Sequence, residues 1–329
     1  MNETFPSVRV AAIQAAPVLF DRDATIAKMA DLVADAAGQG AQIVVLPEAF
    51  VPAYPRGFSF GAVVGSRTDE GRDLWARYWA GSVEVPSPAT DAIAAIARQH
   101  AVYLVVGVVE RDADHGGGTL YCTLLYYGPD GGYLGKHRKL KPTGSERLIW
   151  GEGDGSTLTT FDTEWGRAGG LICWENYMPL ARATMYAKGV HIYFAPTADC
   201  RDAWQATLQH IAVEGRCFVI GCNQFVTRDM VPSDVSTAAE IDAMPEELCR
   251  GGSAIYGPLG NTLAAPLYGG EGIVIADLDM GEIVRSRYDF DASGHYARPD
   301  VFRLEVNETP QHPVVSVANK DDDRGGGRC

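Results

Sequence analysis

The stretch VRVAAIQAAPVLFDRDATIAKMADLVADAAGQGAQIVVLPE, residues 8–48, contains two short apolar segments separated by an amphipathic one. Residues 8–15 and 41–48 are rich in small and β-branched apolar side chains, which favours strands buried on both faces. Between them, apolar residues recur at helical spacing from about Asp23 to Ala37. A buried strand, a helix and a second buried strand predict an α/β layered domain.

The same alternation continues along the rest of the chain. Two apolar segments flank Gly-Pro-Asp-Gly-Gly at 128–132, which indicates a hairpin and therefore antiparallel pairing in addition to parallel strands. The sequence thus predicts a layered α/β domain with a mixed sheet whose two faces are both covered. Further strands are expected at 102–110, 168–173, 190–196, 216–224 and 251–263, and further helices at 91–100, 179–188 and 202–215.

We expect one domain over residues 1–300 and a C-terminal extension over 301–329, because no repeat or Pro- or Ser-rich linker divides the chain. The extension ends in NKDDDRGGGRC at 319–329, a polar, glycine-rich composition that predicts a mobile tail. Residues 54–77 and 229–250 are long and weakly patterned. We interpret them as loops or insertions with a functional or interfacial role.

Composition excludes several classes of protein. The 329 residues include 28 Lys+Arg and 42 Asp+Glu, a formal net charge of −14, so we expect no nucleic-acid partner. With 46% apolar and 21% charged residues, the chain can build a large core. It shows neither a secretory leader nor an apolar run of about 20 residues, so we expect no membrane association. Seven scattered cysteines predict reduced thiols and a cytoplasmic location.

Two residues at predicted strand ends are candidates for chemistry. Cys173 ends the apolar run AGGLIC and precedes a helix with Pro179 near its start, so helix N–H groups are expected to favour its thiolate. A cysteine in an apolar strand is more often a small core residue. Glu48 ends IVVLPE, where the ligand crevices of open α/β sheets lie, although it could equally form a surface cap or ion pair.

A third candidate lies in GKHRKLKPTGSER, residues 135–147. Lys136, Arg138, Lys139 and Lys141 form a positive cluster, which taken alone is more often a solvated face. Glu146 follows closely and could either orient Lys139 or form a surface ion pair with Arg147 or Arg138.

Together, these segments resemble one family pattern in chain order. Glu48 in LPE, Lys139 in HRKLKPT and Cys173 in CWEN are similar to the Glu-Lys-Cys triad of the nitrilase branch of the carbon–nitrogen hydrolase superfamily. Cys-Trp-Glu at 173–175 is typical of that branch, and APTADCRDAWQATLQHIAVEGRCFV at 195–219 resembles plant-type and related bacterial nitrilases. The resemblance implies a four-layer αββα sandwich, assembled as a homodimer that builds larger or spiral homo-oligomers.

The resemblance also implies a reaction. Cys173 would attack a small-molecule nitrile, Glu48 would act as general base, and Lys139 would stabilise the tetrahedral intermediate together with the backbone N–H of Trp174. Thioimidate and acyl-enzyme intermediates would then give a carboxylic acid and ammonia. Glu146 is the candidate for a second carboxylate that orients Lys139.

The substrate pocket is placed only by adjacency. Tyr54 and Trp174 follow Glu48 and Cys173 in the chain, whereas Pro196 and Thr197 end another predicted strand that faces the same crevice. Each pocket residue could also serve ordinary packing. No phosphate loop or metal-ligand cluster occurs, so we expect no cofactor and no metal. The pocket candidates are Tyr54, Trp174, Pro196 and Thr197.

Alternatives remain at this stage. An amidase or carbamoyl-amide hydrolase would use the same triad, and Cys-Trp-Glu favours the nitrilase. A non-catalytic, filament-forming scaffold gains nothing obvious from Glu48, Lys139 and Cys173. A thiol redox sensor would need a resolving cysteine, and none lies near Cys173 in the sequence. The sequence leaves open which nitrile is used and how much amide is released.

Overall fold

The computed structural model describes residues 5–236 and 238–315, and two mixed β-sheets form its centre. The first sheet has the order β14-β1-β2-β4-β5-β6, with β3 beside β4. Its β1, β2 and β4 are parallel neighbours, with β1 and β2 at the strands that residues 8–48 predict, whereas β5 and β6 form the predicted antiparallel hairpin. Its strands are β1 (Ser7–Gln14), β2 (Ile43–Val45), β3 (Val83–Glu84), β4 (Tyr103–Arg111), β5 (Leu120–Tyr127), β6 (Tyr133–Arg138) and β14 (Gly272–Asp279).

The second sheet has the order β11-β12-β10-β9-β8-β7, with β13 beside β12. Parallel pairing joins β8 to β9 and β9 to β10, and antiparallel pairing adds the remaining strands. Its strands are β7 (Thr160–Thr163), β8 (Gly166–Gly170), β9 (Ile192–Thr197), β10 (Phe218–Asn223), β11 (Phe225–Thr227), β12 (Glu247–Tyr256) and β13 (Thr262–Tyr268).

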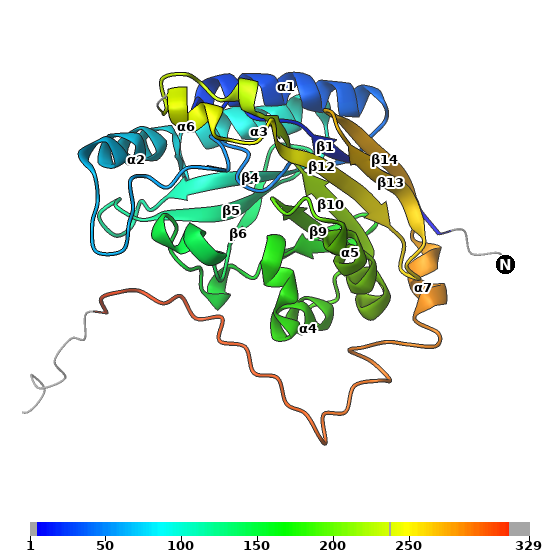
Figure 1. Ribbon diagram of the computed structural model, residues 1–329. Coiled ribbons are helices and arrows are strands. Elements are labelled where there is room, and N and C mark those ends of the chain that lie inside the picture. Colours follow the sequence, from blue (N-terminus) through cyan, green and yellow to red (C-terminus); the bar gives the residue numbers. More distant parts are fainter. Residues whose placement is uncertain (1–4, 237, 316–329) are drawn as a thin grey trace, which may run out of the picture.

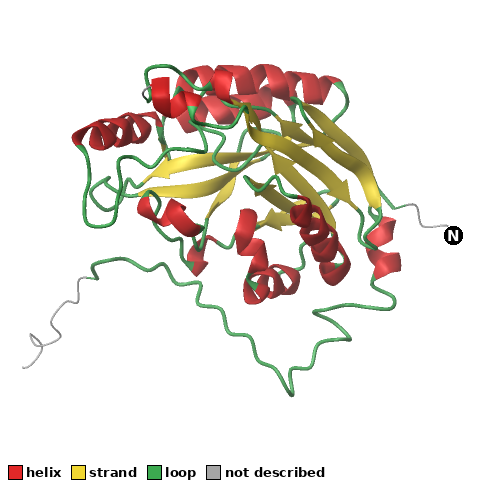
Figure 2. Cartoon of the chain, viewed as in Figure 1, coloured by secondary structure: helices red, strands yellow, loops and turns green. Residues whose placement is uncertain are grey.

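Helices cover the outer face of each sheet, which gives the four-layer αββα arrangement (Figures 1 and 2). Helices α1 (Arg22–Gly38) and α3 (Pro88–His100) pack on the first sheet, and α4 (Pro179–Ala187) and α5 (Asp202–Gly215) pack on the second. The largest core cluster lies between the sheets, where Val45 and Val105 meet Phe194 and Ile220. The expected sandwich is therefore confirmed.

Two expectations for the loops are wrong in part. Residues 54–77 contain the start of helix α2 (Asp69–Gly81), which begins at the N-cap Thr68 with two acidic residues in its first turn. Residues 229–250 contain the short helix α6 (Ala238–Asp242) and the start of β12. Predicted strand 168–173 is also shorter than expected, because β8 ends at Gly170.

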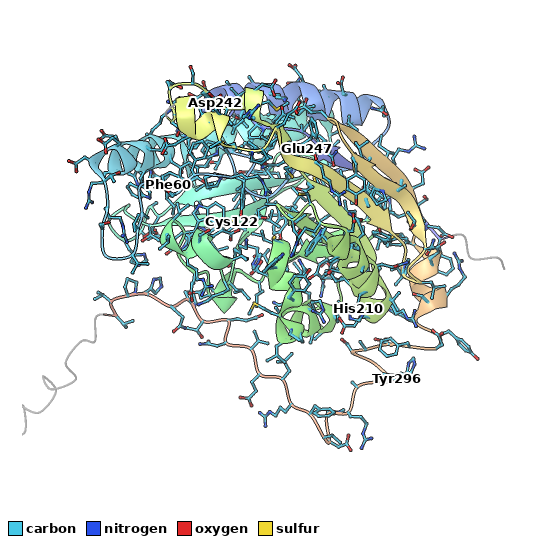
Figure 3. All side chains as sticks on the ribbon, in the orientation of Figure 1. Phe60, Cys122, His210, Asp242, Glu247 and Tyr296 are labelled. Atoms are coloured by element: carbon cyan, nitrogen blue, oxygen red, sulfur yellow. The ribbon has the colours of Figure 1, made fainter. Side chains whose placement is uncertain are left out.

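The last helix, α7 (Gly281–Ser286), is followed by an extended segment (Figure 1). This segment contacts the sandwich through an ion pair between Lys188 and Glu308 and a hydrogen bond from the Gln311 N–H to Asp154. Figure 3 shows Tyr296 on this segment and Cys122 inside the body of the molecule. The predicted mobile tail, 319–329, lies outside the described residues.

Glycine at one position of β4 lets the segment after β2 pass close to the sheet. A Cβ on Gly107 would lie 2.0 Å from the carbonyl oxygen of Pro47 and 2.9 Å from the Cα of Glu48. The next residue, Ala49, has φ of 47°. The backbone that carries Glu48 is therefore held in a bend that requires close contact with β4.

We expect Gly107→Ala to push this bend away from β4 and to lower the free energy of unfolding by about 1–3 kcal/mol. Urea unfolding followed by fluorescence measures the change. Gly118→Ala is the matched control, because a Cβ on Gly118 meets no atom within 4 Å. Equal stability of the two variants would show that the bend does not depend on Gly107.

Candidate active site

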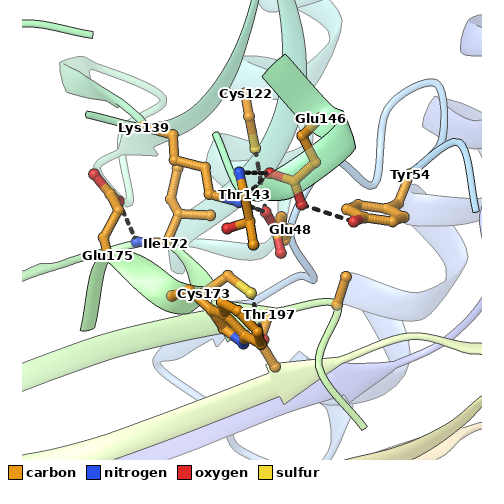
Figure 4. A network of polar contacts seen from close by, with 12 residues as sticks. Glu48, Tyr54, Cys122, Lys139, Thr143, Glu146, Ile172, Cys173, Glu175 and Thr197 are labelled. Atoms are coloured by element: carbon orange, nitrogen blue, oxygen red, sulfur yellow. Dashed lines mark hydrogen bonds and ion pairs between the residues drawn. The ribbon is translucent and has the colours of Figure 1, made fainter. Parts of the chain in front are cut away.

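A buried lysine joins two carboxylates between the sheets. The Nζ of Lys139 lies 2.6 Å from Oε1 of Glu48 and 2.8 Å from Oε2 of Glu146 (Figure 4). The side chains of Lys139 and Glu48 are fully buried. Because Lys139 has carboxylate neighbours, its pKa is raised well above the usual value despite the opposing effect of burial. Lys139 is therefore an ammonium.

Strand ends place these groups. Glu48 follows β2, and Gln224 fixes its backbone by donating from Nε2 to the Glu48 carbonyl over 2.9 Å. Lys139 follows β6, and its N–H donates to the carbonyl of Cys122 over 2.8 Å. Both residues leave their strands toward the space between the sheets, as the sequence predicts for Glu48.

The other cations of the predicted cluster do not crowd Lys139. Lys136 and Arg138 both bind Glu110, over 2.5 Å and 2.6 Å. Lys141 pairs with Glu152 on the exposed side of the segment. Each of these cations has its own carboxylate, so the cluster is neither a single solvated face nor a source of repulsion at Lys139.

Glu146 belongs to a short 3-10 helix, η1 (Gly144–Leu148). Its Oε2 also accepts the N–H of Thr143 over 2.7 Å, and its Oε1 accepts the hydroxyl of Tyr54 over 2.7 Å. The Tyr54 ring packs edge-on against Trp150. Glu146 is thus oriented toward Lys139 rather than toward Arg147 or Arg138. The hydroxyl of Tyr54 contacts the site by donating to Glu146.

Cys173 opens the 3-10 helix η3 (Cys173–Tyr177) just beyond β8. Its φ of 52° lies in the left-handed region, which is strained for a residue with a Cβ and is common at functional sites. The thiol is nearly buried, and the Thr197 hydroxyl donates to Sγ over 3.1 Å. Thr197 ends β9, so a second strand end contacts the nucleophile, as expected.

The prediction that Cys173 rests as a thiolate is wrong. Burial raises the pKa of the Cys173 thiol to about 12, and the charge of Glu48 acts in the same direction. Lys139, the Thr197 hydroxyl and the N–H of Ala198 lower this pKa, but by less. A helix terminus is worth about 0.3–1 kcal/mol, and η3 is a single turn, so burial and the nearby carboxylate outweigh it. The resting group is a neutral thiol.

Glu48 has the properties of a base for this thiol. Its Oε2 is buried and has no hydrogen-bond partner among the described residues, whereas Oε1 binds Lys139. Burial raises the pKa of Glu48; Lys139 opposes the rise and Glu146 adds to it, and the Cys173 thiol is close enough to act on it. Oε2 is therefore free to accept the thiol proton.

Two pocket candidates behave differently from Thr197. Pro196 is buried in β9 beside Thr197. Trp174 is 37% exposed, and its indole N–H donates to Oδ2 of Asp199 over 2.8 Å. Trp174 is thus directed to the surface beside the site instead of being enclosed in its wall.

Sequence reasoning missed a second thiol at the site. The Sγ of Cys122, on β5, lies 3.7 Å from Oε1 of Glu48. No local sequence signal identifies Cys122 as a site residue, because β5 has the pattern of an ordinary buried strand. The N–H of Ala198 was missed as well, because backbone donors have no sequence signature.

Among residues 5–236 and 238–315, one group has metal-like spacing, Asp112, Asp114 and His115, and two of its members are exposed. All six described cysteines are free. In the part of the chain that the structure describes, no helix is long and apolar enough to span a bilayer.

Comparison with known sequences agrees with this geometry. A sequence profile of the carbon–nitrogen hydrolase family matches residues 9–288. The bifunctional nitrilase/nitrile hydratase NIT4A of Lupinus angustifolius is 50% identical, over 97% of this chain and 92% of its own. An aliphatic nitrilase of Sinorhizobium fredii is 53% identical over 94% of this chain and 99% of its own length. Nitrilase 3 of Arabidopsis thaliana is 48% identical over 94% of this chain and 89% of its own length.

Solved structures share the fold. A carbon–nitrogen hydrolase from Helicobacter pylori has a TM-score of 0.69 at 22% identity and covers 90% of this chain and 97% of its own. The C. elegans NitFhit protein has a TM-score of 0.71 at 18% identity and covers 94% of this chain and 70% of its own. The chain therefore belongs to the carbon–nitrogen hydrolase family. Relatives at 48–53% identity over nearly its whole length place it in the nitrilase branch.

If Glu48 accepts the thiol proton, Glu48→Gln should lower kcat for nitrile hydrolysis by about 100- to 10,000-fold, because an amide cannot act as a base. Ammonia release and circular dichroism measure activity and folding. The wild-type rate should fall as acidification protonates Glu48, beginning above the usual carboxyl range because its pKa is raised.

Glu152→Gln is the matched control, since Glu152 is an exposed carboxylate paired with Lys141. It should retain wild-type kcat. A folded Glu48→Gln variant as active as this control would remove Glu48 from the chemistry.

Proposed function

We propose that this protein hydrolyses an organic nitrile to the carboxylic acid and ammonia. The observation that carries the proposal is the buried set in which Lys139 bridges Glu48 and Glu146 while the Cys173 thiol is close enough to the Glu48 carboxyl to act on its pKa. A thiol, a base and a fixed ammonium are the groups that nitrile hydrolysis requires. The family and the nitrilase relatives support the same reaction.

The first half of the reaction begins from a neutral thiol. Glu48 takes the proton as Sγ attacks the nitrile carbon, which avoids forming a free thiolate beside a carboxylate. The proton then passes to the nitrile nitrogen, and a covalent thioimidate forms. The Cys173 backbone in the left-handed region aims Sγ at the substrate.

The second half uses water and the same base. Glu48 removes a proton from water as it adds to the thioimidate, and Lys139 stabilises the charge on the tetrahedral intermediate. Ammonia leaves, and a second water releases the acid from the acyl-enzyme. Glu146 and Tyr54 keep the ammonium of Lys139 directed at this space.

The same set of groups would also serve an amidase. An amide substrate enters at the tetrahedral intermediate, which the thiol forms by attacking the amide carbon, and the base and the ammonium would then act in the same order. The names of two similar relatives combine nitrilase with nitrile hydratase, which supports release of some amide from the tetrahedral intermediate. A non-catalytic scaffold is disfavoured, because burying Lys139 and Glu48 is costly without a use for them.

We also propose that the protein assembles as a homodimer that builds larger oligomers. The surface of η3 and α4 exposes Tyr177, Met178 and Leu180, at 43%, 38% and 67%. The extended segment after α7 exposes Val301 and Phe302 at 56% and 76%. Exposed apolar side chains grouped in this way support self-association. A cytoplasmic location is our further proposal, supported by the free cysteines.

The reaction is tested with matched nitriles and amides. A panel of phenylacetonitrile, benzonitrile, cyanoalanine, short dinitriles and the corresponding amides should show ammonia and acid from at least one nitrile. Cys173→Ala should abolish this release, and intact mass spectrometry of the wild type should show a covalent adduct. Ammonia from amides alone would establish an amidase, and an inert wild type equal to Cys173→Ala would favour the scaffold.

The assembly is tested by charge substitution on the exposed apolar surface. Leu180→Lys should lower the mass measured by light scattering, because an unpaired charge in a contact costs desolvation energy. Leu259→Lys is the control, since Leu259 is similarly exposed, at 59%, but lies in the β12–β13 connection. If Leu180→Lys and a chain ending at residue 296 both keep the wild-type mass, these surfaces are not contacts.

A further inference from the structure

A third buried carboxylate lies beside the site and has no part in the proposed reaction. Glu175, on η3, is 1% exposed. Its Oε2 accepts the N–H of Ile172 over 2.6 Å, and its Oε1 accepts the N–H of Leu140 over 2.5 Å (Figure 4 shows the first contact). One carboxylate therefore binds two backbone segments that are far apart in the chain.

Both of these amides adjoin catalytic groups. Ile172 immediately precedes Cys173, and Leu140 immediately follows Lys139. The two hydrogen bonds connect the turn that carries the thiol to the end of β6 that carries the ammonium. Any shift of the Glu175 carboxylate would change the distance between them.

His137 supplies the opposite charge for this carboxylate. The imidazole is fully buried; its Nε2 lies 3.0 Å from Oε2 of Glu175 and its Nδ1 lies 2.9 Å from the carbonyl of Thr157. Both partners are acceptors, so both ring nitrogens donate, which requires an imidazolium. Burial lowers the pKa of His137, but Glu175 and Thr157 outweigh it and the pKa is raised.

We propose that Glu175, held by His137, is a positioning residue that keeps Lys139 in register with Cys173 and thereby sets the ratio of acid to amide products. The proposal rests on the proposed nitrile hydrolysis. It assigns a task to the carboxylate of the Cys-Trp-Glu motif that no step of the chemistry uses.

The product ratio is sensitive to this register because the tetrahedral intermediate has two exits. It carries OH, NH2 and the Cys173 sulfur on one carbon. If the hydroxyl proton is transferred to nitrogen, the C–N bond breaks and leaves ammonia and the thioester. If that proton is transferred to sulfur, the C–S bond breaks and leaves the amide and the free thiol.

The ammonium of Lys139 and its carboxylates decide which atom receives the proton. With Lys139 in register, proton delivery favours nitrogen and the acid results. A displaced Lys139 leaves nitrogen a poor leaving group, so sulfur departs and amide accumulates.

The turn at Cys173 has a second support that does not involve Glu175. The side-chain N–H groups of Asn176 donate to the carbonyls of Leu171 and Cys173 over 3.0 and 2.9 Å, and Tyr193 donates to Asn176 Oδ1. We therefore expect Glu175→Gln to fold. Glutamine has one acceptor oxygen, so it cannot accept both backbone N–H groups through separate oxygens.

The experiment compares Glu175→Gln with the control Glu152→Gln, with kcat expressed per reactive thiol counted by mass spectrometry. A misplacement of about 1 Å can cost about 100-fold. We expect kcat to fall about 10- to 100-fold, the amide share to rise severalfold, and alkylation of Cys173 by iodoacetamide to slow. His137→Gln, which keeps an N–H donor but not the charge, should shift the product ratio in the same direction.

These readouts separate the possible failures. If the wild type releases nothing from nitriles, the proposed function fails, and alkylation of Cys173 still reports on the register. If nitriles are hydrolysed but folded Glu175→Gln matches Glu152→Gln in kcat per thiol, product ratio and alkylation rate, Glu175 is not a positioning residue. A loss of reactive thiols alone, with the ratio unchanged, would likewise leave Glu175 with a purely structural role.

Discussion

The contact between the Lys139 ammonium and the Glu48 and Glu146 carboxylates is the constraint on which the site depends. Removing an ion from water costs roughly several kcal/mol, and only close partners offset it. Lys139 has two such partners within 2.8 Å, and Thr143 and Tyr54 satisfy the oxygens of Glu146. One oxygen of Glu48 has no partner among the described residues, and we propose that this oxygen accepts the thiol proton.

The charge of this group controls the nucleophile. Two carboxylates and one ammonium leave an excess negative charge near Cys173, so a thiolate there would be repelled as well as desolvated. In the proposed mechanism, sulfur therefore keeps its proton until a substrate carbon is present, and Glu48 removes the proton during attack. A strained backbone and the Thr197 hydroxyl hold the sulfur ready without ionising it.

Much of the fold and of the site could be predicted from the sequence, because local periodicity and strand ends carry that information. Glu48 and Cys173 each end an apolar run that predicts a strand, Lys139 follows the polar strand β6, and strand ends converge in layered α/β folds. The thiolate prediction was wrong, because a helix start is visible in the sequence whereas the depth of burial and the approach of Glu48 are not. Helix α2 was missed because its apolar face is narrow, and Glu175 is marked only by its motif.

The resting protonation state of Cys173 tests the account most directly. Thiolate absorbance near 240 nm can be followed against pH as the difference between the wild type and Cys173→Ala, in which tyrosine ionisation cancels. The account predicts no thiolate step between about pH 6 and pH 10, because a free cysteine ionises near 8.5 whereas the pKa of Cys173 is raised to about 12. A thiolate signal that appears near neutral pH would contradict it and would show an ion pair between sulfur and Lys139 in the resting enzyme.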